Sequence, residues 1–107
     1  MPLLEWNLEN LLKSQSPTGF SDEVLISSIL REILITLMYF HQHNKIHRDI
    51  KSSNIFISRE GKVILSDYGI VSRIKETLTL SGLYGSPCWT APEVINNAPS
   101  TIKSDIW

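Results

Sequence analysis

The sequence predicts a fold of the α+β class, in which one long helix precedes a small antiparallel sheet. Apolar residues recur at spacings of three and four over 21–43, the pattern of a helix with a broad buried face. Two short strand-like runs follow, 54–58 (NIFIS) and 62–65 (KVIL), and the Glu60-Gly61 pair between them is a hairpin turn signal. The polar, Thr- and Ser-rich stretch over 73–86 has no period and predicts a long loop.

The ends of the long helix carry recognisable signals. We expect Ser21 to be its N-cap, with Asp22 and Glu23 in the first turn, where the helix dipole favours negative charge. Asn44 can adopt the left-handed conformation that ends a helix. Shorter helical segments are expected over 7–14, 91–97 and 100–107.

Composition limits the classes of partner and compartment. The formal net charge is -1, which gives no electrostatic reason to expect nucleic acid or an anionic membrane as a partner. The longest apolar runs are only a few residues, so no segment is expected to span a bilayer, and the N-terminus does not resemble a signal peptide. The single Cys88 rules out an internal disulfide and predicts a reducing, cytoplasmic setting.

The segment 47–54 (HRDIKSSN) carries the clearest chemical signal. It places a carboxylate (Asp49), an ammonium (Lys51) and a carboxamide (Asn54) on one short loop before a strand. An Asp can orient a hydroxyl group, and a Lys can neutralise a phosphoryl group in transfer. Such a set suits phosphoryl transfer, in which positioning and charge stabilisation supply most of the catalysis.

A second carboxylate, Asp67, follows the predicted strand pair. Antiparallel pairing across Gly61 brings the end of the second strand back to the start of the first, so Asp67 and Asn54 can face one another. Oxygen ligands from an Asp and an Asn suit Mg²⁺, which takes few protein ligands and completes its shell with phosphate oxygens.

These motifs together resemble the eukaryotic protein kinase family. HRDIKSSN over 47–54 is similar to the kinase catalytic loop, and Asp67-Tyr68-Gly69 resembles the metal-binding DFG motif. Ala91-Pro92-Glu93 matches the APE motif, and 103–107 (KSDIW) resembles the start of the central buried helix of the large lobe. The motifs occur in the family's order and cover essentially the whole chain, from the hinge to that helix.

The resemblance is to the serine/threonine type. Lys51, two residues after Asp49, is typical of that type, and the stretches 85–93 (GSPCWTAPE) and 29–34 (ILREIL) are most similar to the Sterile-20-like branch. The resemblance implies that residues 1–107 are a partial kinase catalytic domain: a mostly helical C-terminal lobe with a short β-hairpin and without the small lobe. It further implies transfer of the γ-phosphoryl group of ATP, with Mg²⁺, to Ser or Thr of protein substrates.

The resemblance also implies residue roles. Asp49 would be the catalytic base, Lys51 would contact the γ-phosphate, and Asn54 and Asp67 would hold Mg²⁺. Ser86 would lie beside Asp49 and help to hold the substrate. His47, Tyr68 and Asp105 would tie the catalytic loop to the core, the backbone of Pro2 and Leu4 would meet adenine, and Phe56 would form the pocket floor.

The activation segment departs from the family pattern. The Thr most often phosphorylated in the Sterile-20-like branch aligns with Gly82, so an upstream activating kinase would have to use a nearby hydroxyl. A phosphate there would pair with Arg48 and order the segment. Tyr68 replaces the usual Phe, and its hydroxyl needs a partner if buried. The candidate acceptors, between which the sequence does not choose, are Thr77, Thr79 and Ser81.

Other chemistries are weaker. His41, His43 and His47 cluster in sequence, but no Cys or carboxylate completes a zinc set at a familiar spacing. Cys88 has no obvious base to make it a nucleophile. A small-molecule kinase is disfavoured because the segment through 91–93 is typical of protein-directed enzymes.

The chief alternative is a truncated, non-catalytic kinase-like binding fragment or a remnant of a gene. The sequence shows no Gly-rich loop and no strand Lys, the parts that normally cover and grip ATP. We therefore expect the isolated 107-residue chain to be inactive and to fold poorly, because its long helix lacks the partners that would bury it. The intact polar set of the site argues against a long-inactive scaffold.

Overall fold

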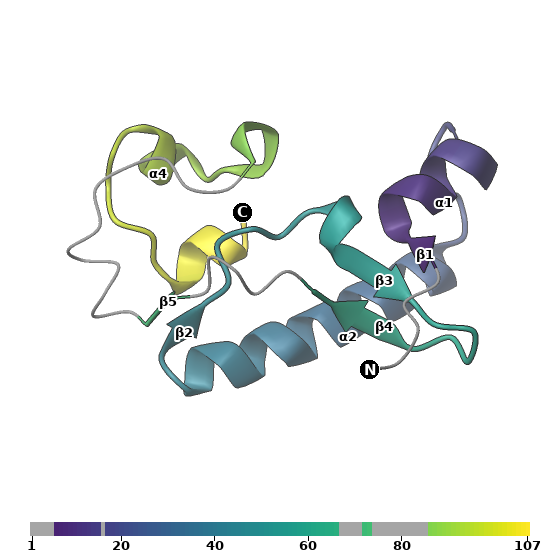
Figure 1. The fold of residues 1–107 in the computed structure, drawn as a ribbon, viewed down its shortest axis with the longest axis horizontal. Coiled ribbons are helices and arrows are strands. Elements are labelled where there is room, and N and C mark those ends of the chain that lie inside the picture. The colour runs from purple at the N-terminus through teal and green to yellow at the C-terminus, as the bar shows by residue number, and fades with distance from the viewer. Residues whose placement is uncertain (1–5, 16, 67–71, 74–85) are drawn as a thin grey trace. The chain divides into compact units, whose positions relative to one another are not determined.

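The computed structural model describes residues 6–15, 17–66, 72–73 and 86–107 (Figure 1). These residues form two compact units. The first contains the described residues up to Thr36 together with Ser52–Ser66, and the second contains Leu37–Lys51 and the described residues beyond Ser66. The elements are β1 (Trp6–Asn7), α1 (Leu8–Gln15), α2 (Glu23–Gln42), β2 (Lys45–Ile46), η1 (Ser52–Asn54), β3 (Ile55–Ile57), β4 (Val63–Leu65), β5 (Ser72–Arg73), η3 (Pro87–Trp89), α4 (Pro92–Ile95) and η4 (Ile102–Asp105).

The predicted hairpin forms the sheet of the first unit. β3 and β4 pair antiparallel, with Ile55 opposite Leu65, and the turn lies where Glu60-Gly61 predicted it. Gly61 has φ +79, a left-handed conformation that disfavours residues with a Cβ, and its N–H donates to the carbonyl of Ser58 at 3.0 Å. In the same turn the pKa of the Glu60 carboxyl is lowered from its usual value. The main cause is the hydrogen bond that the Ser58 hydroxyl donates to this carboxyl.

A third strand and a short helix complete this sheet. Strand β1, which no sequence pattern predicts, is only two residues long and pairs antiparallel with β3. Helix α1 follows directly and agrees closely with the helix expected over 7–14. The side chain of Asn7 caps it, because Oδ1 accepts the N–H of Asn10 at 2.7 Å.

Helix α2 has the predicted length but a different N-cap. Oδ1 of Asp22 accepts the N–H groups of Val24 (2.9 Å) and Leu25 (3.2 Å), so the cap is Asp22 and the expectation of Ser21 is wrong. The helix begins at Glu23, one residue later than Ser21 would place it, and a carboxylate also complements the positive end of the helix dipole. Asn44 has φ +56, which confirms the left-handed C-terminal signal.

The apolar face of α2 is only partly covered. Ile29, Ile33 and Leu37 are buried. Helix α2 has 20 residues, and an 18-residue window within it has a mean hydropathy of 1.5. By length and composition α2 could therefore cross a membrane, contrary to the expectation drawn from the short apolar runs. A buried core helix meets the same test, and the charged pair Arg31–Glu32 at mid-helix would be costly in a bilayer. Exposed apolar side chains along it are Val24, Leu25, Ile26, Leu30, Leu34, Ile35, Met38 and Tyr39.

The second unit is built around a two-stranded ribbon. β2 and β5 pair antiparallel, with Ile46 opposite Ser72, and Ile46 is fully buried. β5 overlaps the loop predicted over 73–86 only at Arg73, and residues 74–85 lie outside the described residues. Helix α4 is shorter than the helix expected over 91–97, because Asn97 turns the backbone to φ +64.

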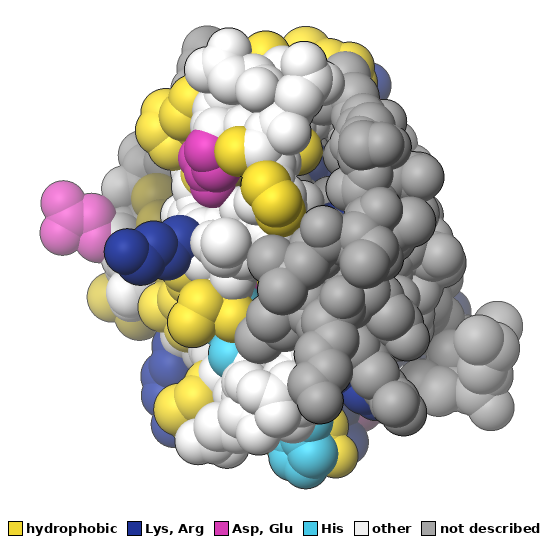
Figure 2. Space-filling view, turned by 90° about the vertical axis from the view of Figure 1, so that its left-hand side faces the viewer, with side chains coloured by type: hydrophobic (Ala, Val, Ile, Leu, Met, Phe, Trp, Pro, Cys, Tyr) yellow, Lys and Arg dark blue, Asp and Glu magenta, His cyan; other side chains and the backbone are white. Residues whose placement is uncertain are grey.

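The C-terminal segment forms a 3-10 turn where a helix start was expected. Thr101 caps η4 reciprocally with Ser104: Thr101 Oγ1 accepts the N–H of Lys103, and Ser104 Oγ accepts the N–H of Thr101 at 3.0 Å. Figure 2 shows hydrophobic side chains in several separate places on the described surface. Beyond α2, the large exposed apolar side chains described in this unit are Trp89, Ile95, Ile102, Ile106 and Trp107.

Candidate active site

The loop that follows β2 is anchored by a buried histidine. His47 is 0% exposed, and its ring stacks on Phe40 with centroids 6.1 Å apart. Its Nδ1 accepts the backbone N–H of Asp49 at 3.2 Å. The imidazole therefore forms a hydrogen bond within the loop, and this bond holds the backbone at Asp49 in place.

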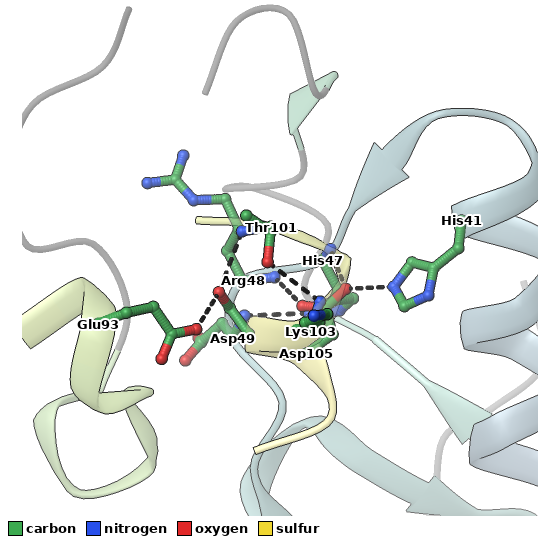
Figure 3. Close-up of polar contacts among 9 residues, drawn as sticks. His41, His47, Arg48, Asp49, Glu93, Thr101, Lys103 and Asp105 are labelled. Atoms are coloured by element: carbon green, nitrogen blue, oxygen red, sulfur yellow. Dashed lines mark hydrogen bonds and ion pairs between the residues drawn. The ribbon is translucent and has the colours of Figure 1, made fainter. Parts of the chain in front are cut away.

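A buried carboxylate from η4 holds the same loop from the other side (Figure 3). Asp105 Oδ2 accepts the N–H of His47 at 2.9 Å, and Oδ1 accepts the N–H of Arg48 at 2.8 Å. Oδ2 also lies 2.8 Å from Nε2 of His41, near the end of α2. One side chain from η4 thus holds both the end of α2 and the loop after β2, which lie 57 to 64 residues earlier in the sequence. This is the structural position that the resemblance implied for His47 and Asp105.

Arg48 takes an unusual backbone conformation in this loop. Its φ is +75, in the left-handed region that costs a residue with a Cβ about 1–2 kcal/mol. The bond from its N–H to Asp105 helps to hold this conformation. Figure 3 shows the guanidinium pointing away from Asp105. The phosphate acceptors expected for it, Thr77, Thr79 and Ser81, lie outside the described residues.

Three of the predicted site residues meet in the second unit. The Ser86 hydroxyl lies 2.6 Å from Nζ of Lys51 and 3.2 Å from Oδ1 of Asp49. Lys51 Nζ is also 3.5 Å from Oδ2 of Asp49. Asp49 is nearly buried, at 9% exposed. The result is a carboxylate, an ammonium and a hydroxyl within hydrogen-bonding or ion-pairing distance of one another.

The predicted magnesium ligands are placed only in part. Asn54 is buried at the end of η1 in the first unit, and its carbonyl accepts the N–H of Ser66 at 2.8 Å. The hairpin register thus brings Ser66 back to Asn54, while the next residue, Asp67, lies outside the described residues, as does Tyr68. An amide and a carboxylate oxygen are donors that fit Mg²⁺.

The expected nucleotide contacts are likewise incomplete. Phe56 lies half-buried in the central strand β3, between Asn7 of β1 and Ile64 of β4. Pro2 and Leu4 lie outside the described residues.

The imidazole rings of the three histidines each contact a different group. His41 contacts Asp105, Nδ1 of His43 contacts the carbonyl of Tyr39 at 2.7 Å, and His47 binds the loop. Among the residues that the structure describes, no group of three metal-ligating side chains is found.

Sequence reasoning missed three contributors to the site. His41 was considered only as a zinc ligand, and Thr90 and Ser104 were not singled out. The Thr90 hydroxyl donates to the carbonyl of Ser86 at 2.8 Å, and the Ser104 hydroxyl donates to Glu93 Oε1 at 2.8 Å. A Ser or Thr four residues after a turn residue is too common a pattern to identify such a contact.

Sequence similarity to known proteins extends over nearly the whole chain. The family model described as the protein kinase domain matches residues 3–107. The chain is 38% identical to the serine/threonine-protein kinase fray2 of Dictyostelium discoideum, over 92% of this chain and 10% of that protein. It is 36% identical to germinal center kinase 3 of Caenorhabditis elegans, over the whole of this chain and 19% of that protein. It is 42% identical to the serine/threonine-protein kinase KIC1 of Saccharomyces cerevisiae, over 90% of this chain and 9% of that protein.

The chain therefore spans at most about a fifth of the length of these relatives. The family model nevertheless accounts for nearly every residue, and the motifs at 47–54 and 91–93 lie within the match. This chain belongs to the protein kinase family, and its relatives include proteins named serine/threonine-protein kinases.

Proposed function

We propose that these residues supply the phosphoryl-transfer site of an ATP-dependent protein serine/threonine kinase. The observation that carries the proposal is the contact between Asp49, Lys51 and Ser86, which join the loop after β2 to the segment before α4. Relatives that are named serine/threonine kinases support the class of substrate.

Asp49 is the group that receives the substrate hydroxyl. Its backbone N–H is bound by His47, and its carboxylate faces the hydroxyl of Ser86, so the side chain is held before any substrate arrives. A positioned carboxylate accepts the hydroxyl proton and aims the oxygen at phosphorus, a contribution of about 10²–10⁴ in rate.

Lys51 supplies a positive charge that offsets the negative charge of the phosphoryl group during transfer. Its ammonium contacts both the Ser86 hydroxyl and the Asp49 carboxylate, which keeps it close to the atom that must attack. From there it stabilises the negative charge of the transferred phosphoryl group. Ser86 connects the two residues and supports the substrate segment.

Asn54 and Asp67 are the residues that would hold Mg²⁺, because their side chains offer the oxygen donors that this metal prefers. Protein kinases as a family use ATP and Mg²⁺. When bound, the ion would neutralise charge on the phosphates of ATP.

The test is phosphate transfer by the full-length protein that carries these residues, with ATP, Mg²⁺ and a mixed Ser/Thr peptide library. We expect Asp49→Asn to lower kcat by about 10²-fold or more, because an amide cannot accept the hydroxyl proton. The matched control is Asp22→Asn, which makes the same change at the cap of α2, where Asn is as good a cap as Asp.

The alternative, a non-catalytic binding fragment, has a distinct outcome. It predicts no transfer by the wild-type protein, or equal transfer by the wild-type and the Asp49→Asn variant, and either result refutes the proposed function. The cytoplasmic setting, the protein substrate and the upstream activating kinase stay predictions from the sequence.

A further inference from the structure

The turn over 86–90 is unusual in how its polar groups are used. Ser86 is the N-cap of η3, with φ -96 and ψ 120, but its side chain makes no capping hydrogen bond. A serine in this position normally caps the helix with its hydroxyl. Here the hydroxyl contacts Lys51 and Asp49 instead, so the turn must be closed by other groups.

Thr90 supplies one of those groups. The carbonyl of Ser86 accepts two hydrogen bonds, from the N–H of Trp89 at 2.9 Å and from the hydroxyl of Thr90 at 2.8 Å. The N–H of Thr90 also donates to the carbonyl of Pro87, at 3.3 Å. Thr90 is half-buried and extended, with φ -78 and ψ 131, which suits a β-branched residue.

We propose that Thr90 is a positioning residue that acts on Asp49 and Lys51 through Ser86, an inference that rests on the proposed function. The ψ angle of Ser86 sets the direction of its carbonyl relative to its own side chain. A carbonyl held by two donors fixes this angle, and the hydroxyl of Ser86 then points to the gap between the Lys51 ammonium and the Asp49 carboxylate.

The alternative is that Thr90 only joins η3 to α4. Its backbone does so, and Ala91 behind it is buried at 3% exposed. That role needs the shape of the side chain and the backbone N–H but not the hydroxyl. Substitutions that remove the Thr90 hydroxyl and keep the volume of the side chain therefore distinguish the two roles.

The decisive variants of the full-length protein are Thr90→Val and Thr90→Ser. We expect Thr90→Val to lower kcat for peptide phosphorylation about three- to tenfold, the range that corresponds to one neutral hydrogen bond, with the KM for ATP unchanged. Thr90→Ser keeps the hydroxyl and should restore most of kcat. Thr36→Val is the matched control, because the Thr36 hydroxyl also donates to a carbonyl, that of Glu32 at 3.0 Å, but within α2.

A double-mutant cycle with Ser86→Ala tests the route of the effect. If Thr90 acts through the Ser86 hydroxyl, Thr90→Val has little further effect on kcat in the Ser86→Ala background. Full additivity overturns the inference, as does a wild-type kcat for Thr90→Val or an equal loss in Thr36→Val. An inactive wild-type protein would instead sink the proposed function, and this inference with it.

Discussion

The Asp105 carboxylate offers the sharpest test of how the site is held. Replacing Asp105 by Asn keeps the shape of the side chain but turns one of its two acceptor oxygens into an NH₂ donor. Among the described residues, Oδ2 has two partners, His47 and His41, whereas Oδ1 has the N–H of Arg48 as its one partner. We expect the new amide to keep its oxygen at the Oδ2 position, so that its NH₂ group faces the N–H of Arg48.

The size of the effect follows from these contacts. Losing one hydrogen bond to a buried carboxylate costs about 1.5–3 kcal/mol. Arg48 can then leave its left-handed conformation, which recovers about 1–2 kcal/mol of backbone strain. The net loss of folding free energy is therefore small, about 1 kcal/mol, because movement of the loop relieves the backbone strain at Arg48.

Movement of the loop should be far more costly for activity. Asp49 follows Arg48 directly, and a displacement of the reacting groups by about 1 Å can cost roughly 10² in rate. We expect Asp105→Asn in the full-length protein to lower kcat by about 10²-fold, while urea unfolding shows only the small stability loss. Unchanged kcat together with wild-type stability would refute this account of the loop, and so would a stability loss as large as the full hydrogen bond with normal kcat.

Two further predictions concern the hairpin and the activation segment. Gly61→Ala should destabilise the protein by about 1 kcal/mol in urea unfolding, because φ is +79, although no atom of the described residues lies within 4 Å of the added methyl group. An unchanged midpoint would contradict this and show that the turn relaxes freely. Mass spectrometry of the active full-length protein should find a phosphate in the activation segment. Once the Arg48 side chain is removed, this phosphate should no longer affect activity. A fully active, unmodified enzyme would contradict this. The expected acceptors are Thr77, Thr79 and Ser81.

Much of the local fold was predictable because it depends on neighbours in sequence. The apolar period placed α2 to within two residues at its start, and Glu60-Gly61 placed the turn that pairs β3 with β4. The prediction failed where competing local signals were of similar strength, as at the cap of α2, where Asp22 prevailed over Ser21. It also failed for two-residue strands such as β1, which form only because a partner strand is present.

The sequence by itself determined the kinase family, since its motifs are runs of chemically specific residues in a fixed order. Only the tertiary structure decided which groups support those motifs. His41 reaches Asp105 across 64 residues, and Thr90 closes a turn whose serine turns toward a lysine 35 residues earlier. Such contacts depend on where the folded backbone brings distant side chains, and a hydrogen bond acts only over a few ångströms, so no local pattern in the chain records them.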